Sequence, residues 1–384
     1  MTAATISRRD VLRWRFHQHG LGRTPRPAAG PADVTLLDYG VQDTGTDGAG
    51  WALANRGVPD AGSEDLAYAW TLRGAPHAYR RSEIGAVAVA TAPWSETDAA
   101  KRIFDASKPL KAAGIPVLDA LRSVAGLMRD LASSPIAKGE MSSRLAGLVG
   151  EPYLRYCKPC DAIHLYEMPF RLAALQAGLE LEPGTSPPVL RRIPKLRPPA
   201  YGHLADEADT RLDVVRNHLR FYGAARMRDV AEFVDAPQKE IEAHWPDDAV
   251  EVKVSGVPGT GKRETRFALA GDVDALAGGG PSGDGRVVRL LASHDGYLQL
   301  RDRELLVGDE ARRKDLWRMI GRPGAIVADG EILGIWRPKA ASSRLTVRIQ
   351  PWGSLKAKDR ALVEEQAERL AAHRGVTLAG ITEE

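Results

Sequence analysis

Two short segments of the chain carry residue types that could do chemistry, and the first is a glycine-rich loop. The stretch VSGVPGTGKR, which ends at Lys262 and Arg263, is close to the phosphate-binding loop of ATPases. That loop requires Ser or Thr after the lysine to hold magnesium, and it must open a helix whose amides face the phosphates. Here Arg263 takes the hydroxyl position, and the flanks AVEVKVS and ETRFALA alternate apolar and polar residues as strands do. We therefore expect a hairpin and no nucleotide cofactor.

The second segment is YCKPCDAIH, which holds both cysteines of the chain, Cys157 and Cys160. A CxxC pair supplies half of a zinc site, and a second pair of ligands is not evident, although His164 lies four residues further on. A redox pair would be expected near a βαβ pattern, which is missing. We predict two thiols in or near a helix start and no metal.

The bulk properties are those of a globular protein of two or three domains. The chain has 384 residues, of which 43% are hydrophobic and 27% charged, and 53 Lys and Arg face 50 Asp and Glu. No apolar run approaches the ~18 residues of a membrane helix, and the polar start MTAATISRRD lacks the apolar core of a secretory signal. We therefore expect a cytoplasmic protein without a membrane partner.

Three helical segments precede the glycine-rich loop. DEADTRLDVVRNHLRFYG has helical apolar spacing, and ARMRDVAEFVD and PQKEIEAHWPD follow as shorter helices. Three helices and a two-stranded hairpin are typical of a winged helix. Its wing tip would bring Lys262 and Arg263 to a DNA phosphate, and Arg226 and Arg228 form a further basic cluster. The alternative for each cluster is a solvated surface.

The same order recurs nearer the N-terminus, in ISRRDVLRWRFHQHG, ADVTLLDYG, GAGWALANRG and the hairpin DLAYAWTLRGAPHAYRR. A weaker copy spans Ile115 to Glu182. After the linker LAGGGPSGDGR come the expected strands VVRLLAS, YLQL, AIVADGEILGIWRP and RLTVRIQPW, and the charged helix KAKDRALVEEQAERLAAHRG ends the fold. The predicted class is α+β, with winged-helix modules at 1–90, 91–200 and 201–272 and a β-rich subdomain at 285–384.

Several of these segments, in this order, resemble the AlkZ/YcaQ family of winged-helix DNA-binding proteins. They are RRDVLRWR, GVQDTG, LRGAPH, LRFYGAARMRDVAEF, HDGYLQLRDR and VADGEILGIWRP. The resemblance implies a concave scaffold for double-stranded DNA and a glycosylase that removes bulky alkylated purines and acts on interstrand crosslinks. Three tandem modules without a dimer element indicate a monomer that wraps a single lesion, and with water as the nucleophile we expect no cofactor.

The catalytic signature of that family is Gln, a hydrophobic residue, then Gln or Asp. Gln42 matches the first position, whereas Asp43 stands at the spacer and Thr44 at the third position. Either Asp43 or Asp47 takes the catalytic role of the third position, or the activity is changed or lost. The structural alternative is that Asp43 or Thr44 caps the helix that begins near Asp47. His77 in LRGAPH resembles a histidine of the family's hairpin, and it could equally be a structural hydrogen-bonding residue.

The chemistry explains why so few groups would suffice. An N7-alkylated purine leaves already carrying positive charge, so hydrolysis of its bond to the sugar needs no general acid. A carboxylate can stabilise the sugar cation, and an amide such as Gln42 can orient the water. The competing hypothesis is a DNA-binding regulator without catalysis. Asp295, Tyr297, Arg301 and Arg303 alternate as in a strand, which indicates either DNA contacts or an internal salt-bridge network.

Overall fold

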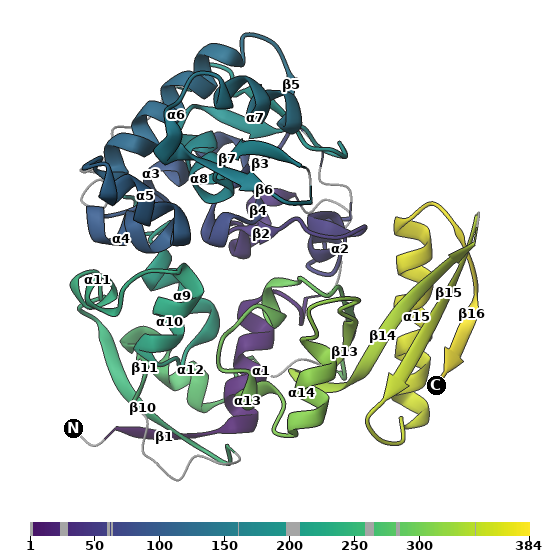
Figure 1. Cartoon of the computed structure of the whole chain (residues 1–384). Coiled ribbons are helices and arrows are strands. Elements are labelled where there is room, and N and C mark those ends of the chain that lie inside the picture. The colour runs from purple at the N-terminus through teal and green to yellow at the C-terminus, as the bar shows by residue number, and fades with distance from the viewer. Residues whose placement is uncertain are drawn as a thin grey trace.

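A computed structural model of the chain describes residues 3–23, 30–59, 62, 64–159, 161–196, 208–257, 265–281, 285–341 and 343–384. Helices and strands are mixed along the whole chain, which confirms the α+β class. In Figure 1 the segment that contains α3 to α8 forms an upper part, and the N-terminal helix and the second half of the chain form a lower part. Strand β2 and helix α2 lie where the two parts meet.

A six-stranded antiparallel sheet organises the upper part, in the order β2-β4-β3-β8-β9-β5. Its strands are β2 (Val41–Gln42), β3 (Leu66–Trp70), β4 (Pro76–Arg80), β5 (Ile136–Ala137), β8 (Leu179–Leu181) and β9 (Val189–Arg192). Six helices accompany it: α3 (Ile84–Ala90), α4 (Glu96–Arg102), α5 (Ser107–Ala112), α6 (Val117–Leu131), α7 (Lys138–Ala146) and α8 (Glu167–Gln176). The predicted helices at α6, α7 and α8 and the hairpin β3–β4 are confirmed.

The region around the glycine-rich loop has the predicted order of elements. Helices α9 (Val214–Tyr222), α10 (Met227–Val234) and α11 (Gln238–Ala243) precede the antiparallel strands β10 (Ala249–Ser255) and β11 (Arg266–Leu269). Strand β1 (Ala4–Ser7) adds itself in parallel to β10, which the sequence did not predict. Lys262 and Arg263 lie outside the described residues.

The N-terminal segment divides its contacts among several parts of the fold. Helix α1 (Arg8–Gln18) packs against α9 and against α12 (Val273–Ala277). Helix α2 (Gly48–Ala54) instead buries Trp51 in the C-terminal core, where the indole N–H donates to the Leu290 carbonyl at 2.6 Å. The predicted helix ADVTLLDYG is wrong, because it forms two 3-10 turns. Asp38, the last residue of the second turn, is buried and binds Arg80, Arg211 and Arg220, so tertiary ion pairs override local propensity.

A five-stranded sheet forms the C-terminal part, in the order β12-β13-β14-β15-β16. Its strands are β12 (Val288–Leu291), β13 (Gly324–Ala328), β14 (Glu331–Ala341), β15 (Arg344–Pro351) and β16 (Thr377–Glu383), and helix α15 (Ala357–His373) packs on it. Helices α13 (Arg303–Leu306) and α14 (Glu310–Leu316) lie between β12 and β13. The Asp329-Gly330 turn and the long helix are confirmed, whereas β16 after the helix was not predicted.

The strand predicted at YLQL is wrong. Gly296–Leu298 is a 3-10 turn, because the Asp295 carboxylate accepts a bond from the Tyr297 N–H at 2.9 Å and so caps the turn. The same carboxylate is buried against Arg56, with two contacts of 2.8 Å. Tyr297 is buried and donates to the Gly330 carbonyl at 2.7 Å. Both residues therefore serve internal contacts.

The cysteine prediction also needs correction. Cys157 ends β6 (Leu154–Cys157), which pairs with β7 (Ala162–Leu165) in a separate hairpin, and Cys160 lies outside the described residues. The thiol of Cys157 thus sits at a hairpin turn and not at a helix start. Within the described ranges, no three His, Cys, Asp or Glu side chains gather as metal ligands would. None of the described helices is long and apolar enough to cross a membrane.

Candidate functional site

Strand pairing places Gln42 at the centre of the candidate site. In the register of β2 and β4, Gln42 lies opposite His77, and the N–H of Asp43 extends the ladder by donating to the Pro76 carbonyl at 2.8 Å. The amide Nε2 of Gln42 donates to the hydroxyl of Thr44 at 3.1 Å. Because side chains alternate along an extended strand, Gln42 and Thr44 share one face and Asp43 lies on the other. The residues at the first and third positions of the expected signature are therefore bonded to each other.

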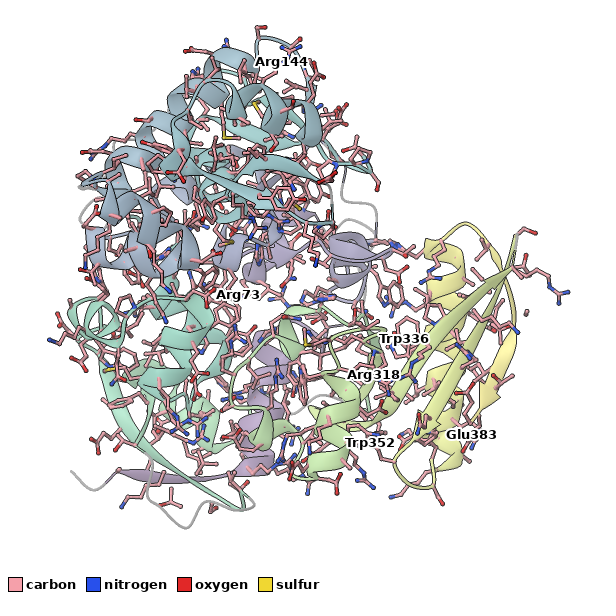
Figure 2. The ribbon with its side chains drawn as sticks, viewed as in Figure 1. Arg73, Arg144, Arg318, Trp336, Trp352 and Glu383 are labelled. Atoms are coloured by element: carbon pink, nitrogen blue, oxygen red, sulfur yellow. The ribbon has the colours of Figure 1, made fainter. Side chains whose placement is uncertain are left out.

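Arg73 fixes the other end of the Gln42 amide. It lies in the tight turn between β3 and β4 with a φ of 58°, and its Nη2 donates to Oε1 of Gln42 at 3.2 Å. Its guanidinium also lies over the Phe233 ring, 4.1 Å from the centroid, and donates to the Phe233 carbonyl at 3.2 Å. Burial lowers the pKa of Arg73 below its usual value. Figure 2 shows Arg73 where the upper and lower parts meet, so one side chain joins the candidate site to α10.

Asp43 binds the start of helix α2. Its Oδ1 accepts a hydrogen bond from the Ala49 N–H at 2.8 Å, and a side chain on Gly48, which has a φ of +40°, would collide with that oxygen. Burial raises the pKa of Asp43, while the bond from Ala49 lowers it. This is the geometry of the helix-capping alternative for Asp43.

Asp47 is engaged in an ion pair. Both of its oxygens bind Arg374, at 2.6 and 2.5 Å, and only 9% of the Asp47 side chain is exposed. Arg374 is the C-terminal cap of α15, so the pair ties the loop after Gln42 to the C-terminal part.

His77 is a buried, neutral imidazole. Its Nδ1 lies 2.9 Å from the Ala75 carbonyl, to which it donates, and 3.1 Å from the Thr71 hydroxyl, which also contacts Tyr79 at 2.8 Å. Burial, and after it the charge of Arg73, lowers the pKa of His77 to about 3. These contacts match the alternative of a structural hydrogen-bonding residue.

A small cavity lies against Gln42, Arg73 and His77 and is closed by Tyr39, Tyr222 and Gln299. Its volume of about 10 Å³ is close to the smallest that holds one water molecule. A second cavity, of about 230 Å³, is lined by Thr44 and the residues that follow it. Its lining includes Thr44, Ser293, Arg322, Arg337 and Arg374, so the candidate segment opens toward a basic surface of the C-terminal part.

The candidate DNA-binding arginines have different surroundings. Arg226 is buried and bonded to Asp229 at 2.7 Å and to Glu304 at 2.9 Å, which makes it part of an internal network. Arg228 is exposed at the start of α10. Arg303 begins α13 and lies over the Trp317 ring at 5.1 Å. Arg301 and Arg303 are not on a strand, because Asp302 between them is buried in ion pairs with Arg15 and Arg266.

Arg301 and Arg303, which the sequence offered as DNA contacts, lie near Arg73 and Arg322, two arginines that sequence reasoning missed. Burial is the largest cause of a lowered pKa in Arg73, Arg303 and Arg322, that of Arg322 to about 10, and the charge of Arg301 lowers all three further. His294 faces the same charges, and burial and Arg322 lower its pKa to about 4. The Nε atoms of Arg301 and Arg322 are buried without a hydrogen-bond partner. Asp235, whose pKa burial raises, faces Arg301 and Arg73. The sequence groups Arg301 with Arg303, but no sequence signal groups them with Arg73, Arg322 and Asp235, which only the fold brings together.

Comparison with known proteins places the chain in a family. The family model described as "DNA glycosylase AlkZ-like" matches residues 51–373, a range that begins after Gln42. The structure is similar to that of Streptomyces sahachiroi DNA glycosylase AlkZ, with a TM-score of 0.69 over 99% of this chain and 100% of that chain, at 19% identity. No curated protein matches the sequence. Because the family model covers most of the chain, the protein belongs to the AlkZ-like family of DNA glycosylases.

Proposed function

We propose that this protein hydrolyses the N-glycosidic bond of N7-alkylated purines in double-stranded DNA, including bulky and crosslinked adducts, and acts as a monomer. The observation that carries the proposal is the Gln42–Thr44 pair, held in place by Arg73 beside a cluster of arginines. Water attacks C1′ of the sugar as the C1′–N9 bond breaks. The electron pair of that bond stays on N9 and neutralises the cationic purine. The products are the free alkylpurine, an abasic sugar and a proton released to solvent.

Gln42 and Thr44 are assigned to positioning the water. The Gln42 oxygen accepts one hydrogen bond from Arg73 and has a second lone pair free to accept another. The Thr44 hydroxyl accepts a hydrogen bond from the Gln42 amide and can donate its own proton to the water. Preorganised polar groups of this kind act without reorganising during the reaction. Because Thr44 supplies no carboxylate, we expect the enzyme to be restricted to leaving groups that already carry positive charge.

The arginine cluster supports the choice of DNA as substrate. Of the four guanidinium groups, those of Arg301 and Arg322 keep a buried Nε without a partner, and Asp235 faces those of Arg73 and Arg301. A concentration of uncompensated cations attracts a polyanion, and Arg is well suited to bind phosphate. We extend the proposal to the winged-helix modules predicted at 1–90, 91–200 and 201–272, which would present these arginines to the duplex.

A second candidate function is DNA binding without base release. It is favoured by Thr44 at the third position and by Asp43, whose carboxylate faces the α2 amides and not the Gln42 face. In that case the arginine cluster would retain the duplex and no abasic site would form.

The test is single-turnover incubation with a labelled duplex that carries one N7-alkylguanine, followed by alkaline cleavage at any abasic site. The wild-type protein is expected to cleave at the lesion, and Gln42→Ala and Thr44→Ala are expected to lose most of that activity. Thr185→Ala is the matched control, because Thr185 bonds only within the β8–β9 turn, at Glu182 and Val189. Lesion binding without cleavage by the wild type would favour the second candidate.

A further inference from the structure

Two apolar side chains stand fully in solvent at the tip of one loop. The loop Arg318–Gly321 joins α14 to β13, and in it Met319 is 100% exposed and Ile320 is 89% exposed. The other large apolar side chains that count as exposed in the described part of the chain range only from 37% to 61%. Single exposed apolar residues are ordinary. Two adjacent ones that are almost fully exposed are unfavourable in water, and they indicate a surface that contacts another molecule.

The base of this loop is held firmly. The indole N–H of Trp317, on one side of the tip, donates to the Leu298 carbonyl at 2.9 Å, and Nη2 of Arg322, on the other side, donates to the same oxygen at 3.3 Å. Gly321 supplies the left-handed conformation of the turn, with a φ of 64°. The base of the loop that carries Met319 and Ile320 is thus fixed by hydrogen bonds, which limits the conformational entropy lost when these side chains bind.

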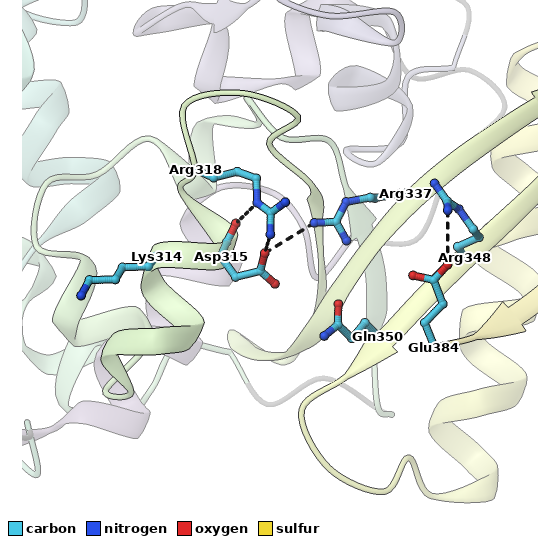
Figure 3. Close-up of a pocket in the computed structure, with 7 residues that line it drawn as sticks. All are labelled: Lys314, Asp315, Arg318, Arg337, Arg348, Gln350 and Glu384. Atoms are coloured by element: carbon cyan, nitrogen blue, oxygen red, sulfur yellow. Dashed lines mark hydrogen bonds and ion pairs between the residues drawn. The ribbon is translucent and has the colours of Figure 1, made fainter.

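Cations flank the tip on both sides. Asp315 forms ion pairs with Arg318 and with Arg337, the latter at 3.5 Å, and Figure 3 shows the two guanidinium groups held around this one carboxylate. The adjoining groove of about 760 Å³ is lined by Lys314, Arg318, Arg337 and Arg348 against two acids, Asp315 and Glu384. The surface beside the apolar tip is therefore basic.

The tip also lies next to the candidate active segment. Arg322, two residues after Ile320, lines the 230 Å³ cavity together with Thr44, and Arg337 lines both that cavity and the basic groove. Because the two cavities share Arg337, arginines lie along the path from Thr44 past the loop to Arg348. A duplex whose backbone followed this path would meet Met319 and Ile320 within its grooves.

We propose that Met319 and Ile320 form a wedge that enters the base stack of duplex DNA next to the lesion, an inference that rests on the proposed function. Apolar wedges of Met, Ile, Leu or Phe, flanked by Arg or Lys, unstack a base step and kink the duplex. Two side chains are too few for a stable protein interface, which needs about 800 Å² from each partner. The flanking arginines match phosphates on both sides of one step. Insertion would open the step beside an adduct or crosslink that cannot be fully extruded.

The test measures unstacking without relying on catalysis. A duplex with a stable tetrahydrofuran abasic analogue carries 2-aminopurine at the neighbouring step, and its fluorescence is recorded while protein is added. Wild-type protein is expected to raise the fluorescence. The double variant Met319→Ser/Ile320→Ser is expected to lose most of that rise and to bind on the order of tenfold more weakly. The slope of affinity against salt should stay unchanged, since no phosphate contact is removed.

The matched control is Leu148→Ser/Ile163→Ser, which removes two exposed apolar side chains of the upper part. It should leave fluorescence and affinity as in the wild type. Equal unstacking by wild type and the Met319→Ser/Ile320→Ser variant would overturn the wedge. A second contradicting outcome is a Met319→Ser/Ile320→Ser variant that loses binding only to phosphatidylglycerol vesicles and behaves as the wild type on DNA. That result would indicate a membrane contact.

The outcomes separate this inference from the proposed function. Loop-dependent unstacking without release of any alkylated base would leave the wedge standing and refute the glycosylase. Base release by the wild type, with unstacking equal in the wild type and the Met319→Ser/Ile320→Ser variant, would refute the wedge and leave the glycosylase standing. If the wild type bound no duplex, both would fail.

Discussion

The guanidinium of Arg73 donates a 3.2 Å hydrogen bond to the amide oxygen of Gln42, 31 residues earlier in the chain. The same guanidinium lies over Phe233 and binds its carbonyl, so one cation sets the orientation of Gln42 and joins it to α10. Without Arg73 the Gln42 amide would be free to rotate or flip. The bond also leaves Nε2 as the end of the amide that faces Thr44.

This bond predicts that Arg73 and Gln42 act as a unit. Gln42→Ala and Arg73→Ala should each lower the single-turnover rate of base release on the order of a hundredfold, because each removes or releases the group that holds the water. The double variant should be close to either single variant, since the second change removes nothing further. Losses that multiply in the double variant would show that the two residues contribute independently.

Thr44 is expected to respond to substitution in both directions. Thr44→Ala should lower base release, whereas Thr44→Asp should raise it about tenfold or more, because a carboxylate on the Gln42 face can stabilise the sugar cation and accept a proton. The adjoining cavity of about 230 Å³ leaves room for the change. The rates of both variants on the N7-alkylguanine duplex check this. An unchanged rate for Thr44→Asp would place the chemistry elsewhere.

Asp43 is expected to contribute mainly to folding. Asp43→Ala should lower the free energy of unfolding by about 1 kcal/mol, because the Ala49 N–H loses its acceptor, whereas Asp43→Asn keeps an oxygen there. Denaturant unfolding at neutral pH measures both. A rate loss in Asp43→Asn as large as that in Gln42→Ala, with stability retained, would instead make Asp43 catalytic.

The raised pKa of Asp43 gives a further expectation in acid. Burial disfavours its ionised form, so the contribution of this group to stability is fully present below the unfolded value of 3.8 and is lost as pH rises through the folded value. Relative to Asp43→Asn, the wild type should therefore lose stability as pH rises across that range. Unfolding of both proteins in a pH series checks the sign.

His77 should make the protein sensitive to mild acid. Its folded pKa of about 3 lies below the unfolded value of 6.5, so the unfolded state binds the proton first and stability falls as pH drops below about 6.5. The slope for one such group is about 1.4 kcal/mol per pH unit. His77→Gln should reduce the loss measured between pH 6.5 and 5 by about 2 kcal/mol. An identical loss in the variant would mean that His77 is protonated or exposed in the folded state.

The ion pair between Asp47 and Arg374 should hold the loop after Gln42 to the end of α15. Asp47→Ala and Arg374→Ala should each lower the free energy of unfolding by about 2 kcal/mol, because each leaves a largely buried charge unpaired. The double variant should be no less stable than either single one. Thermal unfolding of the three proteins tests this, and additive losses would show that the two side chains act separately.

Local patterns in the sequence determined most of the helices and several hairpins. The helical spacing of apolar residues located α6 and α9, the alternation around VSGVPGTGKR located β10 and β11, and the Asp329-Gly330 turn located β13 and β14. These signals are local, because a helix turn or a tight hairpin depends on residues a few positions apart. The local sequence after Gln42 also opened the capping alternative for Asp43, whereas the pairing of Gln42 with His77 came only from the structure.

Only the tertiary structure decided what surrounds Gln42. The bond from Arg73 to Gln42, the pairing of Asp47 with Arg374 and the approach of Arg322 to Arg301 and Arg303 join segments that no local pattern relates. The same holds for β1 beside β10 and for the exposed pair at the Met319 loop, since exposure is a property of the packed surface. Local chemistry specified the elements of this protein, and long-range packing and charge pairing assembled its site.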